Sequence, residues 1–447
     1  AYTFSGDYTD QGAFPYGLYD TKSGIVAPVN INDPSSYKRT MLSNSLLTEY
    51  KVRNVQFSST TGYQYLNDDM KMDQDFSPKS IFTLNQLQKQ RAASQEFVLK
   101  NISLSQYQWS FGLYGFYNHL KTEGPVTFKE DGIKEVLQPV FDQIKENVNN
   151  PKMPSLTITD KELYIPGTFK TPSFGLALFH QSTYNGLFTE GLSVTAGIRI
   201  DYEKQKMEYQ SEAKMNMAAS FGKLEIPLSD LYETTVMDIH TNQDFWQLLP
   251  KVSLKYTCTP STYTYFSISK GYKTGGYNVQ LSADVMQSQM KYDMMKAFKD
   301  MIPGELPKPA PVEDVAAYKP EQSWNYELGI RSELIASHLN AELTLFYMDI
   351  QDLQITQFVN SGNGRILTNA GKAKSMGLEA SLRARLTSEL TADWNYGYTH
   401  ATFKNYDNGK ENFKGKYIPY TPRHTTSLGL QYSLSLIHIS EPTRQAE

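Results

Sequence analysis

Residues 376–386 read Met-Gly-Leu-Glu-Ala-Ser-Leu-Arg-Ala-Arg-Leu, and apolar and polar side chains alternate along this stretch. The apolar set is Met376, Leu378, Ala380, Leu382, Ala384 and Leu386, and the intervening set includes Glu379, Ser381, Arg383 and Arg385. A period of two places successive side chains on opposite faces of a β-strand. The stretch therefore predicts a strand with one dry face and one wet face.

The same alternation recurs along the whole chain, as in residues 192–201 and 252–257. It predicts about fourteen strands, near residues 1–10, 36–51, 53–67, 92–102, 107–119, 172–184, 191–209, 245–257, 262–272, 322–334, 339–350, 370–386, 389–404 and 423–432. Several of these exceed the five or six residues that are usual in a soluble β-sandwich. Their length favours a larger sheet.

The connections between these strands fall into two classes that alternate strictly. Very short ones, such as 103–106, 260–261 and 387–388, are followed by long ones, such as 119–171 and 273–321. Alternate connections of an antiparallel meander lie at opposite ends of the sheet, so all the long loops should lie on one side. Short turns on one side and long loops on the other are typical of outer-membrane barrels.

Composition is compatible with a membrane barrel. The chain has 447 residues, of which 40% are hydrophobic, and 31 are tyrosines, whose amphipathic rings suit membrane–water interfaces. No segment approaches the roughly 18 apolar residues of a spanning helix, but a barrel strand needs only about 9–11 residues, half of them polar. We therefore predict an all-β fold: an antiparallel up-and-down transmembrane β-barrel, with short helices in its long loops.

The sequence shows no catalytic or cofactor-binding constellation. It lacks the His-Glu-x-x-His motif of zinc proteases, the Walker loop that binds phosphate and the Gly-x-Ser-x-Gly motif of serine hydrolases. Its seven histidines are scattered along the chain. The single cysteine, Cys258, cannot form an internal disulfide, and the net charge of −4 argues against a nucleic-acid partner. We expect a protein that is not an enzyme and binds neither a cofactor nor a metal of its own.

The most distinctive stretch is Ser269-Lys270-Gly271-Tyr272-Lys273-Thr274-Gly275-Gly276-Tyr277-Asn278, where a strand enters a long loop. It resembles the "KGYKxGGxN" motif of TonB-dependent outer-membrane receptors. Residues 318–329 resemble the "Y-x-P-E…NYELG" strand of that family, and residues 369–379 resemble its "NAGKA…GxE" strand. The likeness runs from about residue 42 to residue 432 and is closest to siderophore-type receptors.

The resemblance implies a barrel of about 22 strands filled by an N-terminal plug, which the inner-membrane TonB complex pulls. It implies active import of a scarce solute, most often a ferric siderophore, by a monomer in the outer membrane of a Gram-negative bacterium. The plug, the TonB box and the last strands would lie outside this chain. A passive porin and a secreted β-rich glycan-binding protein remain the alternatives.

Tyr272, Lys273, Tyr277 and Asn278 are the candidate contacts to cargo or plug. A lysine and tyrosines suit an anionic, aromatic iron chelate through charge and cation–π attraction. Packing at the strand end is the competing interpretation for each of them. Two helices are expected in the loops, one around residues 133–144 with a kink or break at Pro139, and one around residues 290–302, which packs rather than binds.

Two further expectations concern the extent of the barrel. Residues 434–447 do not alternate and resemble a translated sequencing adapter, so we predict a partial barrel domain over residues 1–433 and a tail that is not native. A part-barrel has two unpaired edges, so a gapped barrel or a curved sheet is expected. Leu378, Leu382 and Leu386 should face lipid, and Glu379, Arg383 and Arg385 should face the lumen.

Overall fold

The structure is a computed structural model of the chain. It describes residues 1–12, 17, 19–73, 75–103, 105–148, 153–222, 224–227, 235–279, 282–297, 299, 305–306, 308–309, 311, 316–358, 365–408 and 411–433. The predicted tail, residues 434–447, lies outside this set, so its origin stays a prediction. None of the helices in the described residues is long and apolar enough to span a bilayer.

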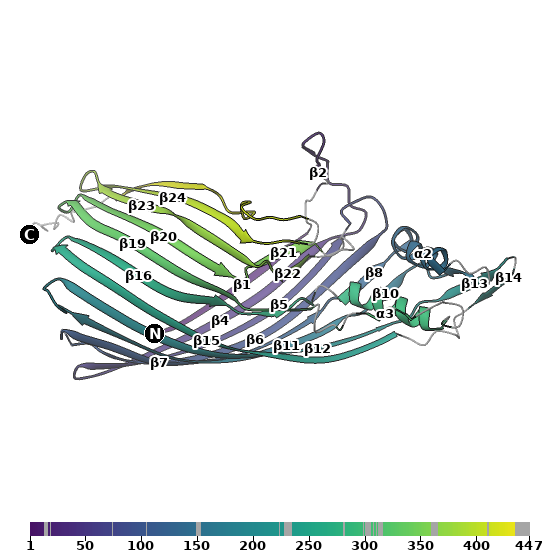
Figure 1. The fold of residues 1–447 in the computed structure, drawn as a ribbon, viewed down its shortest axis with the longest axis horizontal. Coiled ribbons are helices and arrows are strands. Elements are labelled where there is room, and N and C mark those ends of the chain that lie inside the picture. The colour runs from purple at the N-terminus through teal and green to yellow at the C-terminus, as the bar shows by residue number, and fades with distance from the viewer. Residues whose placement is uncertain are drawn as a thin grey trace, which may run out of the picture.

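One antiparallel sheet dominates the fold, and its main path runs through fourteen strands in chain order (Figure 1). They are β1 (Tyr2–Gln11), β4 (Ser36–Val52), β5 (Val55–Asp73), β6 (Phe82–Asn101), β7 (Tyr107–Glu123), β11 (Thr168–Asn185), β12 (Leu192–Ala213), β15 (Thr235–Thr259), β16 (Thr262–Lys273), β19 (Glu321–Ile335), β20 (Leu339–Gln351), β23 (Lys372–Arg385), β24 (Leu390–Asn405) and β25 (His424–Tyr432). The number and order of the predicted strands are confirmed. Within the described residues β1 and β25 each pair with one neighbour, so the sheet is a curved, open part of a barrel, as predicted.

Most strands are longer than predicted, chiefly at the end that leads into a long loop, whereas β23 and β25 are slightly shorter. The expected strand 92–102 begins at Phe82, and the expected strand 245–257 begins at Thr235. In these extensions, for example Asp238-Ile239-His240-Thr241, polar residues occupy both faces. Alternation of hydrophobicity fades where the outward side chains are polar as well, which is why the pattern missed these extensions.

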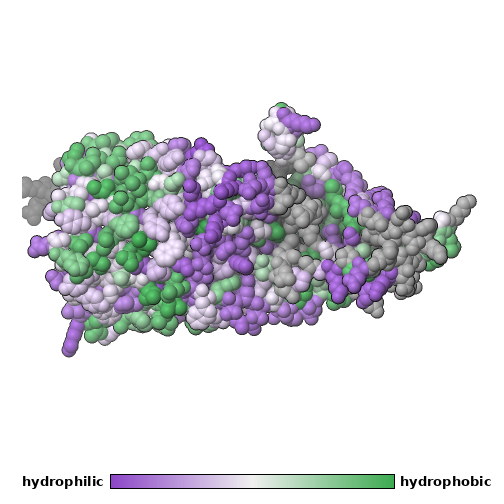
Figure 2. Space-filling model, viewed as in Figure 1, coloured by the Kyte–Doolittle hydropathy of each residue, from purple (hydrophilic) through white to green (hydrophobic). Residues whose placement is uncertain are grey.

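The two faces of the sheet differ as the alternation predicts. The cross-strand row Val194, Leu254, Phe266, Leu328, Leu345 and Leu378 runs over neighbouring strands in register. Leu328 is 51% exposed and Leu345 is 46% exposed, so this row faces outward. The adjacent row is Ser193, Lys255, Tyr265, Gly329, Thr344 and Glu379, on the inner face. Figure 2 shows the resulting apolar surface over the short-turn half of the sheet and hydrophilic surface over the middle of the molecule.

All short connections lie at one end of the sheet and all long ones at the other, as predicted (Figure 1). Two of them have only two residues, Arg53 and Asn54 between β4 and β5 and Pro260 and Ser261 between β15 and β16, and Arg53 adopts a φ of 49°. The longest connections, residues 124–167 and 274–320, leave from the opposite end. The apolar outward face implies a membrane around the sheet, and all the long loops therefore lie on one side of that membrane.

The loops on the long side build a small subdomain with its own core. It contains β8 (Val126–Phe128), β10 (Leu163–Ile165), α1 (Glu130–Gly132), η1 (Ile133–Leu137), α2 (Gln138–Val148), α3 (Ser282–Ala297) and a three-stranded sheet of β9 (Ser155–Ile158), β13 (Met217–Phe221) and β14 (Leu224–Pro227). Phe128, Met217 and Met286 are almost fully buried in this core. The remaining short strands are β2 (Tyr19–Asp20), β3 (Ile25–Val26), β17 (Gly276–Tyr277), β18 (Ala317–Tyr318), β21 (Gln354–Phe358) and β22 (Arg365–Asn369).

Both predicted helices exist, with one difference. The first is continuous from Glu130 to Val148 and does not break at Pro139. Instead the turn before Pro139 is a π-helical turn, Ile133–Leu137, which widens the helix where proline removes a hydrogen-bond donor. In the second helix Met290 and Met295 pack in the core, which supports a packing role, whereas Phe298 and Ile302 lie outside the described residues.

Candidate functional site

The inner wall of the sheet carries two shallow depressions lined by polar side chains. One, of about 510 Å³, is lined from β7, β11, β12, β15, β16 and β19 and includes Lys251, Lys255, Tyr265 and Glu327. The other, of about 340 Å³, is lined from β20, β23, β24 and β25 and includes Glu379. Glu379 thus lies on the inner wall, where it was predicted. The wall offers hydrogen bonds and charges of both signs to whatever fills the barrel.

An arginine dominates the inner wall of β12. The Arg199 guanidinium lies 5.6 Å from the centre of the Phe179 ring and 5.8 Å from that of Tyr114. Its Nε donates to Asp201 Oδ1 at 2.8 Å, and Asp201 is only 5% exposed. Stacking and a carboxylate together fix the cation on the wall. Sequence patterns gave no indication of this group, because its partners come from three strands.

Tyr272 connects this group to the loop motif. It is half-buried near the end of β16, and the Asp201 and Glu203 carboxylates lie close to its hydroxyl. The pairing of β16 with β15 ends at Ser269, so the chain can turn away from that neighbour before Tyr272. Lys273, the next residue, is exposed. Of the four predicted contact residues, Lys273 is exposed, and Tyr272, Tyr277 and Asn278 are half-buried.

The two glycines that follow form a tight corner. A Cβ at Gly275 would lie 2.5 Å from the Tyr318 backbone oxygen, and one at Gly276 would lie 2.3 Å from the Tyr318 hydroxyl. Three glutamine side chains bind the corner from outside the motif. Gln205 Nε2 donates to Gly275 O at 3.0 Å, Gln243 Nε2 to Gly276 O at 3.1 Å and Gln354 Nε2 to Thr274 O at 2.8 Å.

Tyr277 and Asn278 serve the base of the loop. Tyr277 packs beside Phe169, Met207 and Tyr209, and burial raises the pKa of its hydroxyl. Asn278 Nδ2 donates to Leu367 O at 2.9 Å, and Asn278 Oδ1 accepts from Leu367 N at 2.8 Å. The amide therefore pairs with the backbone of β22 as another strand would. These contacts match the packing interpretation of Tyr277 and Asn278.

The stretches that carried the family resemblance meet at this corner, although they lie far apart in the chain. Lys319 N donates to Asn369 Oδ1 at 2.8 Å, and the Gln354 backbone N–H donates to Glu321 Oε2 at 2.8 Å. Gly371, next in the third stretch, has a φ of 66° and would place a Cβ 2.3 Å from Asn405 O. Residues 270–278, 318–321 and 369–373 thus form one junction, which we call the motif junction.

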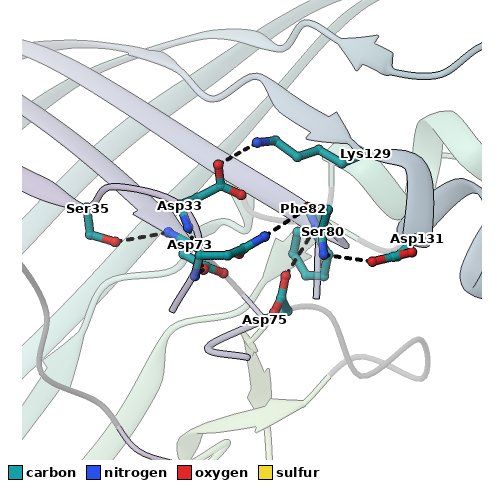
Figure 3. A network of polar contacts seen from close by, with 9 residues as sticks. Asp33, Ser35, Asp73, Asp75, Ser80, Phe82, Lys129 and Asp131 are labelled. Carbon is teal, nitrogen blue, oxygen red and sulfur yellow. Dashed lines mark hydrogen bonds and ion pairs between the residues drawn. The ribbon is translucent and has the colours of Figure 1, made fainter. Parts of the chain in front are cut away.

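A second polar network ties other loops together at the same end (Figure 3). Asp73 Oδ2 accepts from the backbone N–H of Asp33 at 3.3 Å, Ser35 Oγ accepts from Asp73 N at 3.1 Å, and Lys129 pairs with Asp33. Asp131 Oδ2 accepts a hydrogen bond from the Ser80 backbone N–H at 2.9 Å. In the described part of the chain, no group of three or more acidic, histidine or cysteine side chains is arranged to hold a metal ion. The network joins loop backbones and is a structural feature.

The family comparison agrees with this geometry. The family model described as "TonB dependent receptor-like, beta-barrel" matches residues 1–439. The chain belongs to the TonB-dependent receptor family. Members of this family are transport receptors rather than enzymes, and they reside in the Gram-negative outer membrane.

Individual relatives are distant. The pesticin receptor of Yersinia enterocolitica is 23% identical over 287 residues, which cover 64% of this chain and 33% of that protein. The crystal structure of the ferric yersiniabactin uptake receptor FyuA from Yersinia pestis aligns with a TM-score of 0.63 at 20% identity, over 98% of this chain and 54% of that one. The siderophore receptor PiuA from Acinetobacter baumannii gives a TM-score of 0.57 at 13% identity, over 96% of this chain and 59% of that one. The chain therefore spans about a third of the pesticin receptor and just over half of each of the two solved receptors.

Proposed function

We propose that this TonB-dependent receptor chain is the barrel part of an outer-membrane receptor for active import of a ferric siderophore. The observation that carries the proposal is the continuity between the inner wall and the motif junction. Arg199, Asp201 and Tyr272 form a charged and aromatic path along the wall, which ends where Lys273 enters the longest loop. Cargo that reaches the barrel from the loop side would meet this path first.

Tyr272 and Lys273 are the residues that we propose to contact the cargo, while Tyr277 and Asn278 hold the loop base. An anionic chelate with aromatic donors would be attracted by the Lys273 ammonium and would stack on tyrosine rings. Siderophore receptors among the similar structures support this cargo class. The same family membership favours a receptor over the porin and the glycan-binding alternatives, and it implies TonB and a plug as partners.

Growth on defined iron sources tests the proposal. A strain that lacks the gene should grow normally on ferrous salts and fail on the ferric siderophore that the receptor takes, and loss of TonB should produce the same defect. Complementation with the full-length gene should restore growth. Equal growth of mutant and parent on every ferric siderophore would refute iron as the cargo, and import independent of TonB would refute the active mechanism.

A further inference from the structure

The outward face carries a cluster of cations immediately on the loop side of its apolar belt. Lys89, Lys121 and Lys170 lie on β6, β7 and β11 and are directly opposite one another in the strand register. The next row toward the short-turn end places Arg91 opposite His119, and Lys206 of β12 lies in the same row beyond Pro172. We call these five permanent cations, Lys89, Arg91, Lys121, Lys170 and Lys206, the basic rim.

The rim has an excess of positive charge that the protein does not neutralise. Lys121 pairs with Glu123, and Lys170 reaches Glu208 at 3.4 Å. Lys89, Arg91 and Lys206 are exposed, and no ion pair joins them to a described residue. Like charges directly opposite on neighbouring strands destabilise a sheet. Three lysines in one row therefore indicate that an anion from outside the chain belongs beside them.

The surface below the rim identifies the medium that supplies this anion. The next row toward the short turns contains Tyr117 and Phe174, which are opposite one another, and continues into Lys204 opposite Asp244; the row after it places Tyr202 beside Trp246. Tyr117 is 52% exposed and Trp246 is 68% exposed. Beyond them the outward side chains are aliphatic, such as Leu178 and Ile200. The order aliphatic, aromatic, cationic is the order in which a strand meets acyl chains, the interface and headgroup phosphates.

The loop-side ends of β20 and β23 carry a different arrangement. There Lys374 lies opposite Asp349, and Asp349 also pairs with Lys404 at 2.7 Å. Both lysines there lie beside a carboxylate on the same face. The rim is therefore a local feature of β6, β7, β11 and β12 and does not simply reflect the abundance of lysine.

We propose that the basic rim binds the phosphate groups of an anionic lipid in the leaflet on the loop side. The rim lysines and Arg91 would contact the phosphates, while Tyr117, Phe174 and Trp246 would hold the first methylenes of the acyl chains. The inference rests on the membrane orientation in the proposed function, and it extends that function with a lipid site outside the barrel.

Native mass spectrometry of the full-length protein in detergent, titrated with bisphosphorylated lipid A, tests the site. Each lysine near an anionic lipid surface strengthens binding roughly fivefold. The triple variant K89Q/K121Q/K170Q should therefore lose at least tenfold in affinity, after allowance for Glu123 and Glu208. The control K134Q/K145Q/K374Q removes the same charge from the loop helices and from the balanced side of the sheet, and it should bind as the parent does.

Further ligands and variants in the same assay identify the source of the anion and control for misfolding. Dephosphorylated lipid A should bind weakly to all variants, and inorganic phosphate should not displace the bound lipid. E123Q/E208Q, which keeps every cation, should bind more tightly than the parent. Equal affinity of the triple variant, the control and the parent would overturn the proposal, as would weaker binding by E123Q/E208Q. Siderophore-dependent growth is measured separately, so loss of the import function would not be confused with loss of the lipid site.

Discussion

Replacement of Asn278 by alanine should release the β21–β22 hairpin from the motif junction. The Asn278 amide makes two hydrogen bonds to the backbone of Leu367, at 2.8 and 2.9 Å. A typical hydrogen bond contributes about 1 kcal/mol net, and a partly buried backbone group left without a partner costs more. We therefore expect the hairpin to lose about 2–3 kcal/mol of local stability, which corresponds to a ~30- to 150-fold larger opening constant.

Hydrogen exchange of the full-length receptor in detergent, followed by mass spectrometry, measures the opening constant of the hairpin. Peptides that cover Arg365–Asn369 should exchange faster in N278A by that factor, whereas peptides from β23 and β24 should be unchanged. Asn242→Ala, at an exposed position on β15, is the matched control and should leave the hairpin unaffected. If the exchange rate of these peptides changes less than threefold in N278A, the Asn278 hydrogen bonds do not hold the hairpin, and the assigned role of Asn278 is wrong.

Four other predictions follow from the same geometry. Gly371→Ala should lower the unfolding temperature, because alanine at a φ of 66° costs about 1–2 kcal/mol before the close approach to Asn405 O is counted. Leu378→Arg, midway along the outward face of β23, should cost about 2–4 kcal/mol and reduce the heat-modifiable folded band on gels, whereas Glu379→Arg on the inner wall should not. Lys273→Glu should weaken siderophore binding about fivefold, the scale of one exposed charge contact, with unchanged folding. Burial raises the pKa of the Asp73 carboxyl above its ordinary value of 3.8, so the folded state retains a proton that the unfolded state loses. The free energy of unfolding should therefore fall as pH rises through that raised pKa. Asp73→Asn should flatten the pH profile of thermal unfolding.

Most of the sheet was predictable because its physics is local. Side chains such as Leu378 and Glu379 alternate between lipid and water, and the alternation alone predicted the strand, its faces and its neighbours. The prediction failed where the outward side chains stop being apolar. Residues 235–244 of β15 still alternate between exposed and more buried positions, but most of them are polar, so a genuine strand reads as a polar loop.

The site was predictable only in part. The motif at residues 270–278 marked the strand end where the motif junction forms, but it did not show that Tyr277 and Asn278 pack at the loop base while Lys273 is exposed. That distinction depends on Gln205, Gln243 and Gln354, which converge from β12, β15 and β21. Each is an ordinary polar residue in its own strand, and only the register of distant strands brings the three together. Arg199 escaped notice for the same reason, since both rings that it contacts lie on other strands.

The division into short turns and long loops has a thermodynamic consequence for how such a receptor can diversify. The connection between β5 and β6 spans residues 74–81, and that between β16 and β19 spans residues 274–320. Because closure entropy grows only with the logarithm of loop length, the longer connection costs about 1.5 kcal/mol more to close. Every strand still pairs with the same neighbours in the same register. Large insertions at the loop end of the sheet thus cost the scaffold little, so the loops can change without redesign of the wall that spans the membrane.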